Sequence, residues 1–255
     1  MNNNDSGLLA EQEVITEINN KVYSSINNNL RQVIRCLFGV VNENSLVKCY
    51  KVDDENKTDF VIEINKEKRN VSMKQGRAEI VHNEILNNFC NFLLENGISD
   101  RTVETIKMFH YGDGTSDGTG EKRYPYIKVV SMYADRIREA NYELNASSDF
   151  IIRVMKRTVF EGTSKTPIVA DCIYFGNIHF GRVATKKQIF KHINRRDFSW
   201  IENLHIGPLL LRPHSRYVDR PIYDVRNRNR IILYWPNLSA DIDYISSHYN
   251  YNFTF

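Results

Sequence analysis

Residues 58–76, TDFVIEINKEKRNVSMKQG, decide the fold of this chain because they contain two β-like runs joined by a short polar turn. The runs are residues 59–65 and 70–76, and the turn is read at KEKR. Side chains alternate between the two faces of a strand, so Ser72 and Lys74 share a face of the second run. A hairpin centred between Lys66 and Glu67 pairs Asp59 with a residue close to Lys74. A charged side chain inside a sheet is costly unless another group uses it, so this pair is a candidate site.

The sequence around this hairpin predicts more strands and several helices. A third β-like run at 45–52 precedes it, and the short gaps predict an antiparallel meander. Apolar spacing predicts helices over 8–38, interrupted near the Asn run, and over 79–97. YPYIKVVSM (124–132) is β-like, and 134–147 is helical. The last third is read as strands joined by one helix around 185–193. The expected fold is α/β, with a central mixed β-sheet flanked by helices.

Composition places the chain among ordinary globular proteins. It has 255 residues, of which 42% are hydrophobic and 25% charged, with a net charge of +3. We expect a single domain over 1–255 with a catalytic core at about 8–130. The absence of an apolar run of 18 residues and of a signal-like N-terminus predicts a cytoplasmic protein without a membrane segment. Four widely spaced cysteines predict reduced, buried thiols.

The hairpin resembles the PD-(D/E)xK nuclease superfamily, in which an Asp that opens one strand and an acid-x-Lys on the next hold a metal ion and a water. The resemblance implies a restriction-endonuclease-like core with Mg²⁺ as the cofactor. It implies that Asp59 binds the metal and that Lys74 positions or activates the attacking water. Two departures stand out, since Thr58 replaces the usual Pro and Ser72 replaces the second acid.

Type II restriction endonucleases with a Ser-x-Lys variant are similar in this respect, and they take a Glu from the following helix. This resemblance makes Glu84 the expected second acid and metal ligand, one to two turns into a helix, with Glu79 and Glu63 as alternatives. Ser72 would supply a supporting hydrogen bond. The strings SMKQG…VHNE, GDGTSDGTG and HIGPL strengthen the likeness. It implies a sequence-specific DNA endonuclease of a restriction system, acting on double-stranded DNA as a homodimer.

Basic residues gather in two stretches of the C-terminal half, which is typical of a polyanion-binding surface. A solvated surface with internal ion pairs is the competing interpretation of the same residues. The expected DNA contacts are Arg212, Arg216, Arg220, Arg226, Arg228 and Arg230, followed by Lys186 and Lys187. Lys191, Arg195 and Arg196 extend the second stretch.

The sequence also contains a pattern typical of another function. The run Asp113-x-Thr115-x-Asp117-Gly118 fits the start of an EF-hand loop, but Tyr124 stands where a bidentate Glu is required. A glycine-rich turn is the preferred interpretation. The alternatives that stay open are a structure-specific repair nuclease and a DNA- or RNA-binding protein without catalysis.

Overall fold

A computed structural model describes residues 3–52, 56–76, 79–214 and 228–249. Its backbone contacts divide the chain into two compact units. The first unit comprises residues 1–78, 156–195 and 237–255, and the second comprises 79–155 and 196–236. The chain therefore passes between the units several times, and the expected core at 8–130 takes residues from both.

The first unit is built on a six-stranded mixed sheet. Its strand order is β1 (Lys21–Val22), β2 (Leu46–Lys51), β3 (Phe60–Ile64), β4 (Glu67–Lys74), β6 (Cys172–Gly176) and β7 (Gly181–Thr185). β4 and β6 are parallel, and the other neighbours are antiparallel. The meander of three strands predicted from the sequence is confirmed as β2, β3 and β4. The mixed sheet and the α/β class are confirmed as well.

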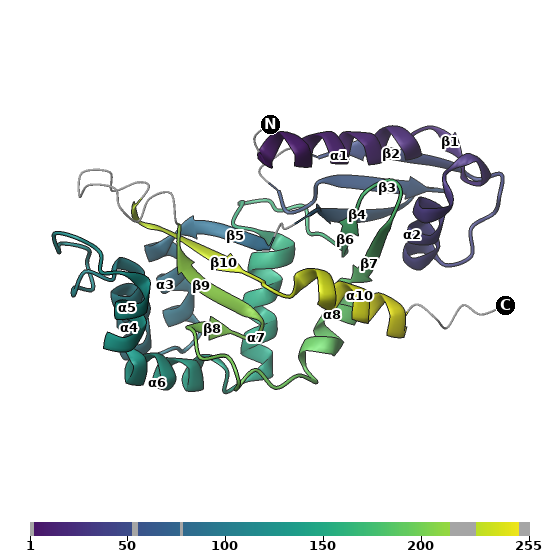
Figure 1. Cartoon of the computed structure of the whole chain (residues 1–255). Helices are drawn as coiled ribbons and strands as arrows, with labels where there is room; N and C mark the ends of the chain where they lie inside the picture. Colours follow the sequence, from purple (N-terminus) through teal and green to yellow (C-terminus); the bar gives the residue numbers. More distant parts are fainter. Residues whose placement is uncertain (1–2, 53–55, 77–78, 215–227, 250–255) are drawn as a thin grey trace. The chain divides into compact units, whose positions relative to one another are not determined.

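Helices cover this sheet. They are α1 (Asn3–Ile18), α2 (Asn28–Phe38), a π-helix (Lys156–Glu161), α8 (Lys186–Ile193) and α10 (Leu238–Tyr249), with a short 3₁₀ turn at Tyr23–Ser25. Figure 1 shows α1 running along the sheet beside β2. Buried side chains of α1 and α2 pack on one face of the sheet, where Val71, Met73 and Tyr174 are fully or almost fully buried. Burial of this apolar surface is the main favourable term for the first unit.

The hairpin that carries the candidate pair turns one residue earlier than the sequence analysis placed it. Ile64 lies opposite Glu67, so the turn consists of Asn65 and Lys66, both with positive φ. Positive φ at both central positions matches the right-handed twist of the strands, and Asn tolerates it well. KEKR is therefore mostly strand, and extending the ladder places Asp59 beside Ser72, with Lys74 two residues further along the same face.

The second unit contains a four-stranded antiparallel sheet in the order β5 (Ile80–Ile85), β10 (Arg230–Tyr234), β9 (Leu209–Pro213) and β8 (His205–Ile206). Its helices are α3 (Leu86–Glu95), α4 (Asp100–Tyr111), α5 (Tyr126–Met132), α6 (Ala134–Leu144) and α7 (Ser148–Met155). Among the residues described, no helix is long and apolar enough to cross a membrane.

Three elements differ from the sequence-based predictions. The predicted helix over 79–97 is wrong in its first third, because 80–85 pairs with β10, some 150 residues away, and only 86–95 is helical. The β-like run YPYIKVVSM is the helix α5, which begins directly after Pro125, a residue that favours helix starts. The reading of the last third with one helix was also wrong, since α10 follows α8 there.

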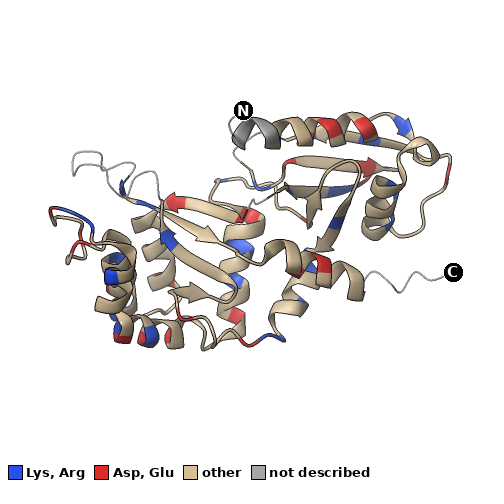
Figure 2. Cartoon of the chain, viewed as in Figure 1, with Lys and Arg blue, Asp and Glu red and all other residues tan. Residues whose placement is uncertain are grey.

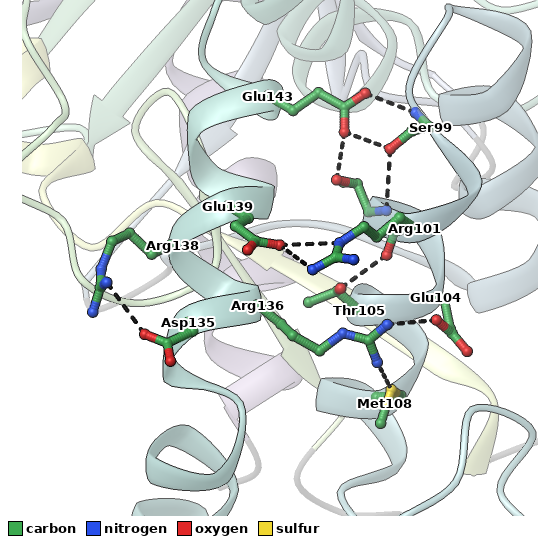
Figure 3. A network of polar contacts seen from close by, with 11 residues as sticks. Ser99, Arg101, Glu104, Thr105, Met108, Asp135, Arg136, Arg138, Glu139 and Glu143 are labelled. Atoms are coloured by element: carbon green, nitrogen blue, oxygen red, sulfur yellow. Dashed lines mark hydrogen bonds and ion pairs between the residues drawn. The ribbon is translucent and has the colours of Figure 1, made fainter.

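Polar contacts join α4 to α6 in the second unit (Figure 3). The Glu143 carboxylate accepts hydrogen bonds from the amide and hydroxyl of Ser99, at 2.8 and 2.7 Å, and from the Thr102 hydroxyl at 2.5 Å. Ser99 is the N-cap of α4, so Glu143 places a negative charge where the helix dipole favours one. Burial acts to raise the pKa of Glu143, but these hydrogen bonds outweigh it and lower the pKa overall.

Candidate active site

Asp59 stands at the point where β3 begins, and its backbone is fixed on both sides. Its amide donates to the Val71 carbonyl on β4 (2.9 Å), and its carbonyl accepts from the Val52 amide after β2 (3.0 Å). Its carboxylate oxygen Oδ2 accepts a hydrogen bond from the Met73 amide at 2.5 Å. An amide of β4 thus bonds to a carboxylate instead of a ladder carbonyl, and this bond sets the direction of the Asp59 side chain.

Lys74 and Ser72 meet the same oxygen of Asp59. The Lys74 ammonium Nζ lies 3.7 Å from Asp59 Oδ2, and the Ser72 hydroxyl donates to it at 3.3 Å. Lys74 Nζ also donates to the Met73 carbonyl at 2.8 Å. Ser72 is buried, whereas the side chains of Lys74 and Asp59 are 24% and 22% exposed, so solvent reaches the charged pair. The structure brings together Asp59, Ser72 and Lys74, three of the four predicted catalytic residues.

A strap of residues 168–171 braces the two strands that carry this pair. The buried Thr58 hydroxyl donates to the Ile168 carbonyl at 2.8 Å, and the Ile168 amide donates to Asn56 Oδ1 at 2.9 Å. The strap therefore binds the two residues that flank Lys57, directly before Asp59.

The same strap is hydrogen-bonded to β4. The Asn70 side chain donates to the Val169 carbonyl at 2.9 Å, and the Asn70 amide donates to Asp171 Oδ2 at 2.9 Å. The Asp171 amide returns a bond to the Asn70 carbonyl at 2.8 Å. Sequence reasoning missed Thr58, Asn70 and Asp171 as supports. The polar Asn70 at a strand position and the replacement of Pro by Thr58 were the available signals.

The site offers oxygen ligands, the type that a hard divalent cation prefers, but it offers few of them. Mg²⁺ is commonly held by one or two carboxylates together with waters and substrate phosphates. Asp59 supplies one carboxylate, and within the described part of the chain its second oxygen, Oδ1, accepts no hydrogen bond. No group of three or more His, Cys, Asp or Glu side chains suited to a metal occurs among the described residues.

The three candidates for a second acid have different surroundings. Glu84 lies on β5 of the second unit, so the expectation that it sits on a helix was wrong. It is buried and lies 2.9 Å from His82 Nε2, its neighbour on the same strand face. Glu79 is also in the second unit, where its carboxylate accepts a bond from the Tyr234 hydroxyl. Glu63 belongs to the first unit and lies within 4.0 Å of Lys48 and 3.6 Å of Lys68.

The predicted DNA-contacting residues fall into three groups. Arg216, Arg220 and Arg226 lie outside the described residues. Arg228 forms an ion pair with Asp113 at 2.8 Å, with side chains 10% and 0% exposed, so this arginine is used inside the second unit. Arg212 on β9 lies over the Tyr234 ring, 5.0 Å from its centroid, and Arg230 donates to Asn83 at 2.9 Å.

Lys186 and Lys187 occupy the first turn of α8, which a capping box of Thr185 and Gln188 begins. Lys187 is exposed and Lys186 is half-buried. Two cations at a helix N-terminus oppose the helix dipole, which favours anions there. An anion bound near this turn would be attracted both by the dipole and by the two lysines.

The GDGTSDGTG loop (112–120) is held by its own side chains. Asp113 Oδ1 accepts from the amide and hydroxyl of Thr115, and Asp117 Oδ1 accepts from those of Thr119. The other oxygen of Asp113 is occupied by Arg228. Gly112 ends α4 with a φ of 60°, where a Cβ atom would lie 2.0 Å from the Arg123 guanidinium. The loop therefore has the contacts of a glycine-rich turn.

Comparisons with known proteins give one structural likeness. No family model matches the chain, and no curated protein matches it. Among solved structures, the chain is similar to the restriction endonuclease MspI in complex with its cognate DNA, with 12% identity and a TM-score of 0.48. The match covers 91% of this chain and 93% of that one. At this identity and TM-score the likeness carries no conclusion about what this chain does.

Proposed function

We propose that the chain is a metal-dependent DNA endonuclease that hydrolyses phosphodiester bonds at Asp59, Ser72 and Lys74. One observation carries the proposal. A lysine ammonium lies 3.7 Å from a carboxylate that a backbone amide holds in place, at the meeting point of two neighbouring strands. The pair is partly exposed, as a site for a polymeric substrate must be.

The groups present match the needs of phosphodiester hydrolysis. The oxygen of a water forms a bond to phosphorus, and one P–O bond of the backbone breaks. A phosphate monoester and a hydroxyl group are left, and the proton of the water passes to solvent or to the leaving oxygen. The Lys74 ammonium would orient the water or donate to the phosphoryl oxygens as negative charge develops on them. Ser72 and the Met73 amide would keep the Asp59 carboxylate in one orientation.

Mg²⁺ is the proposed cofactor, and Asp59 would be its carboxylate ligand in the first unit. When bound, such an ion polarises the phosphate and lowers the pKa of a water. The second acid expected from the sequence, Glu84, belongs to the second unit, where it is buried beside His82. In the first unit, waters and phosphate oxygens would complete the coordination of the ion at Asp59.

The proposed substrate is double-stranded DNA, recognised by sequence as in a type II restriction system. The paired lysines in the first turn of α8 support a polyanionic substrate, because their charge is unfavourable to the helix alone. Arg212 and Arg230 are further candidates for contact with DNA, whereas the buried pairing of Arg228 with Asp113 favours an internal role for that residue.

Digestion of long DNA with and without Mg²⁺ tests the proposal. We expect cleavage with Mg²⁺ and none with EDTA. Cleavage should be about a hundredfold to a thousandfold slower for Lys74→Ala and Asp59→Asn, as for a lost electrostatic contact in a transition state. Lys68→Ala is the matched control, since Lys68 lies on the same strand with its side chain 57% exposed. This variant should cut at the wild-type rate.

Binding of the same DNA in EDTA separates the alternatives. If Lys74→Ala binds normally but does not cut, catalysis depends on Lys74. If the wild-type protein binds but cuts no DNA, the chain is a binding protein and the nuclease proposal is wrong. Discrete products from plasmid DNA indicate sequence specificity, whereas cutting confined to branched or damaged DNA indicates a repair nuclease.

A further inference from the structure

Three residues form a row across neighbouring strands of the first unit, starting from Lys74. Lys74 lies opposite Phe175 on β6, and Phe175 lies opposite Arg182 on β7. The adjacent row, Met73, Tyr174 and Val183, belongs to the apolar core on one face of the sheet. Because side chains alternate along each strand, Lys74 and Arg182 point away from that core, on the same face of the sheet.

The row fixes how far apart the two cations stand. Neighbouring strands are about 4.8 Å apart, so the backbones of Lys74 and Arg182 are separated by about 10 Å, with Phe175 between them. The phosphates of one B-form DNA strand wind around the helix axis as they rise by about 3.4 Å each, so a separation of about 10 Å spans only about one to two phosphodiester steps. Both side chains have flexible stems, and α10, which packs against β6 and β7, approaches Arg182 through Asp243.

The backbone of Arg182 follows a tightly hydrogen-bonded turn, whereas its side chain makes only weak contacts. Asn177 Oδ1 accepts from the amides of His179 and Phe180 and so closes the β6–β7 turn. Gly181 packs against the Tyr174 ring, where a Cβ atom would lie 2.4 Å from a ring carbon. The Arg182 side chain is 54% exposed, its Nη1 donates to the Gly181 carbonyl at 3.1 Å, and its Nε lies 3.9 Å from Asp243. An exposed ion pair at this distance contributes little, so Arg182 is available for another anion.

We propose that Arg182 binds a backbone phosphate of the DNA strand whose scissile phosphate lies at Lys74. This inference rests on the proposed nuclease function and adds to it a second contact point, which sets the direction in which the strand crosses the sheet. A phosphate contact of this kind positions DNA without reading its sequence. Arg182 would thus raise affinity equally for all duplexes.

The salt dependence of DNA binding tests Arg182. Binding of a labelled mixed-sequence duplex is measured by fluorescence anisotropy in EDTA, from 50 to 200 mM salt, for the full chain. Loss of one phosphate contact lowers the slope of log K against log salt by about 0.9. We therefore expect Arg182→Gln to weaken binding about tenfold at 50 mM salt and about threefold at 200 mM. Arg182→Lys should restore most of the affinity and the slope.

A matched control keeps the result specific. Arg138 is an exposed arginine that also lies in a weak ion pair, 3.2 Å from Asp135, and Arg138→Gln should leave both affinity and slope unchanged. If Arg182→Gln keeps the wild-type slope while the wild type binds DNA, the Arg182 inference is wrong and the nuclease proposal is untouched. If the wild type binds no duplex at any salt concentration, the proposed function fails, and the inference fails with it.

Discussion

At the scale of single residues, the Asp59 carboxylate owes its position to groups of the neighbouring strand. The Met73 amide and the Ser72 hydroxyl both donate to Oδ2, and Lys74 approaches the same atom. Ser72 stands where the resemblance to PD-(D/E)xK nucleases predicts an acid. A second carboxylate at this position would face the Asp59 oxygen across about a hydrogen-bond length, so serine removes a like-charge contact. The Ser72 hydroxyl supplies a hydrogen-bond donor to Asp59 at this position instead.

His110 gives a pH-dependent prediction for the second unit. Burial lowers the pKa of His110 to about 4, although its Nε2 lies 2.9 Å from the Arg228 carbonyl. Between pH 6.5 and 4 the unfolded chain takes up a proton here that the folded chain does not, so stability falls as pH falls. This lowering of the pKa of His110 corresponds to a loss of about 3 kcal/mol in the free energy of unfolding as the pH falls from 6.5 to 4.

Urea unfolding at pH 7, 5.5 and 4 checks this prediction. His110→Gln keeps an N–H donor for the Arg228 carbonyl but does not titrate, so it should lose less stability between pH 7 and 4 than the wild type, by about 3 kcal/mol. Equal losses in the two proteins would show that His110 titrates normally when folded.

At the scale of elements, the strap 168–171 joins the start of β3 to β4, and Thr58 tests its importance. Thr58→Val removes the hydroxyl that binds the Ile168 carbonyl but keeps the shape of the side chain. We expect a loss of about 1 kcal/mol in stability, typical of one hydrogen bond, and a slower cleavage step with unchanged DNA affinity. Thermal unfolding and single-turnover cleavage measure the two effects.

Thr58→Ser is the control for that substitution, because it keeps the hydroxyl. The serine variant should recover most of the cleavage rate. A valine variant that cuts as fast as the wild type would mean that the strap does not position Asp59.

The contact between α4 and α6 provides a second prediction at this scale. Glu143→Gln removes the negative charge of the carboxylate that accepts three hydrogen bonds at the start of α4. We expect the free energy of unfolding to fall by about 1 kcal/mol at pH 7, because solvent screens the interactions of this half-buried group. Because the pKa of Glu143 is lowered on folding, the wild type loses this advantage as pH falls below about 4.5.

Glu139, on the same helix as Glu143, provides the control for this substitution. It pairs with Arg101 at 2.6 Å, but both side chains are more than half exposed. Glu139→Gln should therefore change the free energy of unfolding by less than about 0.5 kcal/mol at either pH. A larger effect at Glu139 than at Glu143 in urea unfolding would contradict the role of Glu143 as a helix cap.

At the scale of the whole molecule, the division into units predicts how fragments behave. A fragment of residues 1–130 lacks β6, β7, α8 and α10, and so exposes the β4 edge and the core side chains Val71 and Met73. We expect it not to fold cooperatively, as measured by circular dichroism during thermal unfolding. A sharp transition for this fragment would show that the sheet is stable without its C-terminal strands.

Cutting both strands of a symmetric DNA site calls for two catalytic centres, which favours a homodimer. Sedimentation of the full chain in the presence of a duplex with its cleavage site should therefore show two protein chains for each duplex. A single chain for each duplex, with both strands still cut, would exclude the dimer.

The local part of this structure follows from patterns of neighbouring residues. Strand alternation and short polar gaps were enough to predict the meander β2–β3–β4 and the proximity of Asp59 and Lys74, because both depend on residues close together in the chain. The turn lies one residue earlier than the polar run KEKR predicts, because Asn65 and Lys66 take the positive φ angles.

Which distant segments pair depends on contacts across the whole fold. The parallel pairing of β4 with β6 joins residues about 100 positions apart. It brings the strap beside β4 and places Arg182 two strands away from Lys74, in the same row. The pairing of β5 with β10 turned a helical pattern into a strand and placed Glu84 in the second unit. Local periodicity contains no information about such partners, because their free energy comes from backbone ladders and burial between segments that the loops bring together.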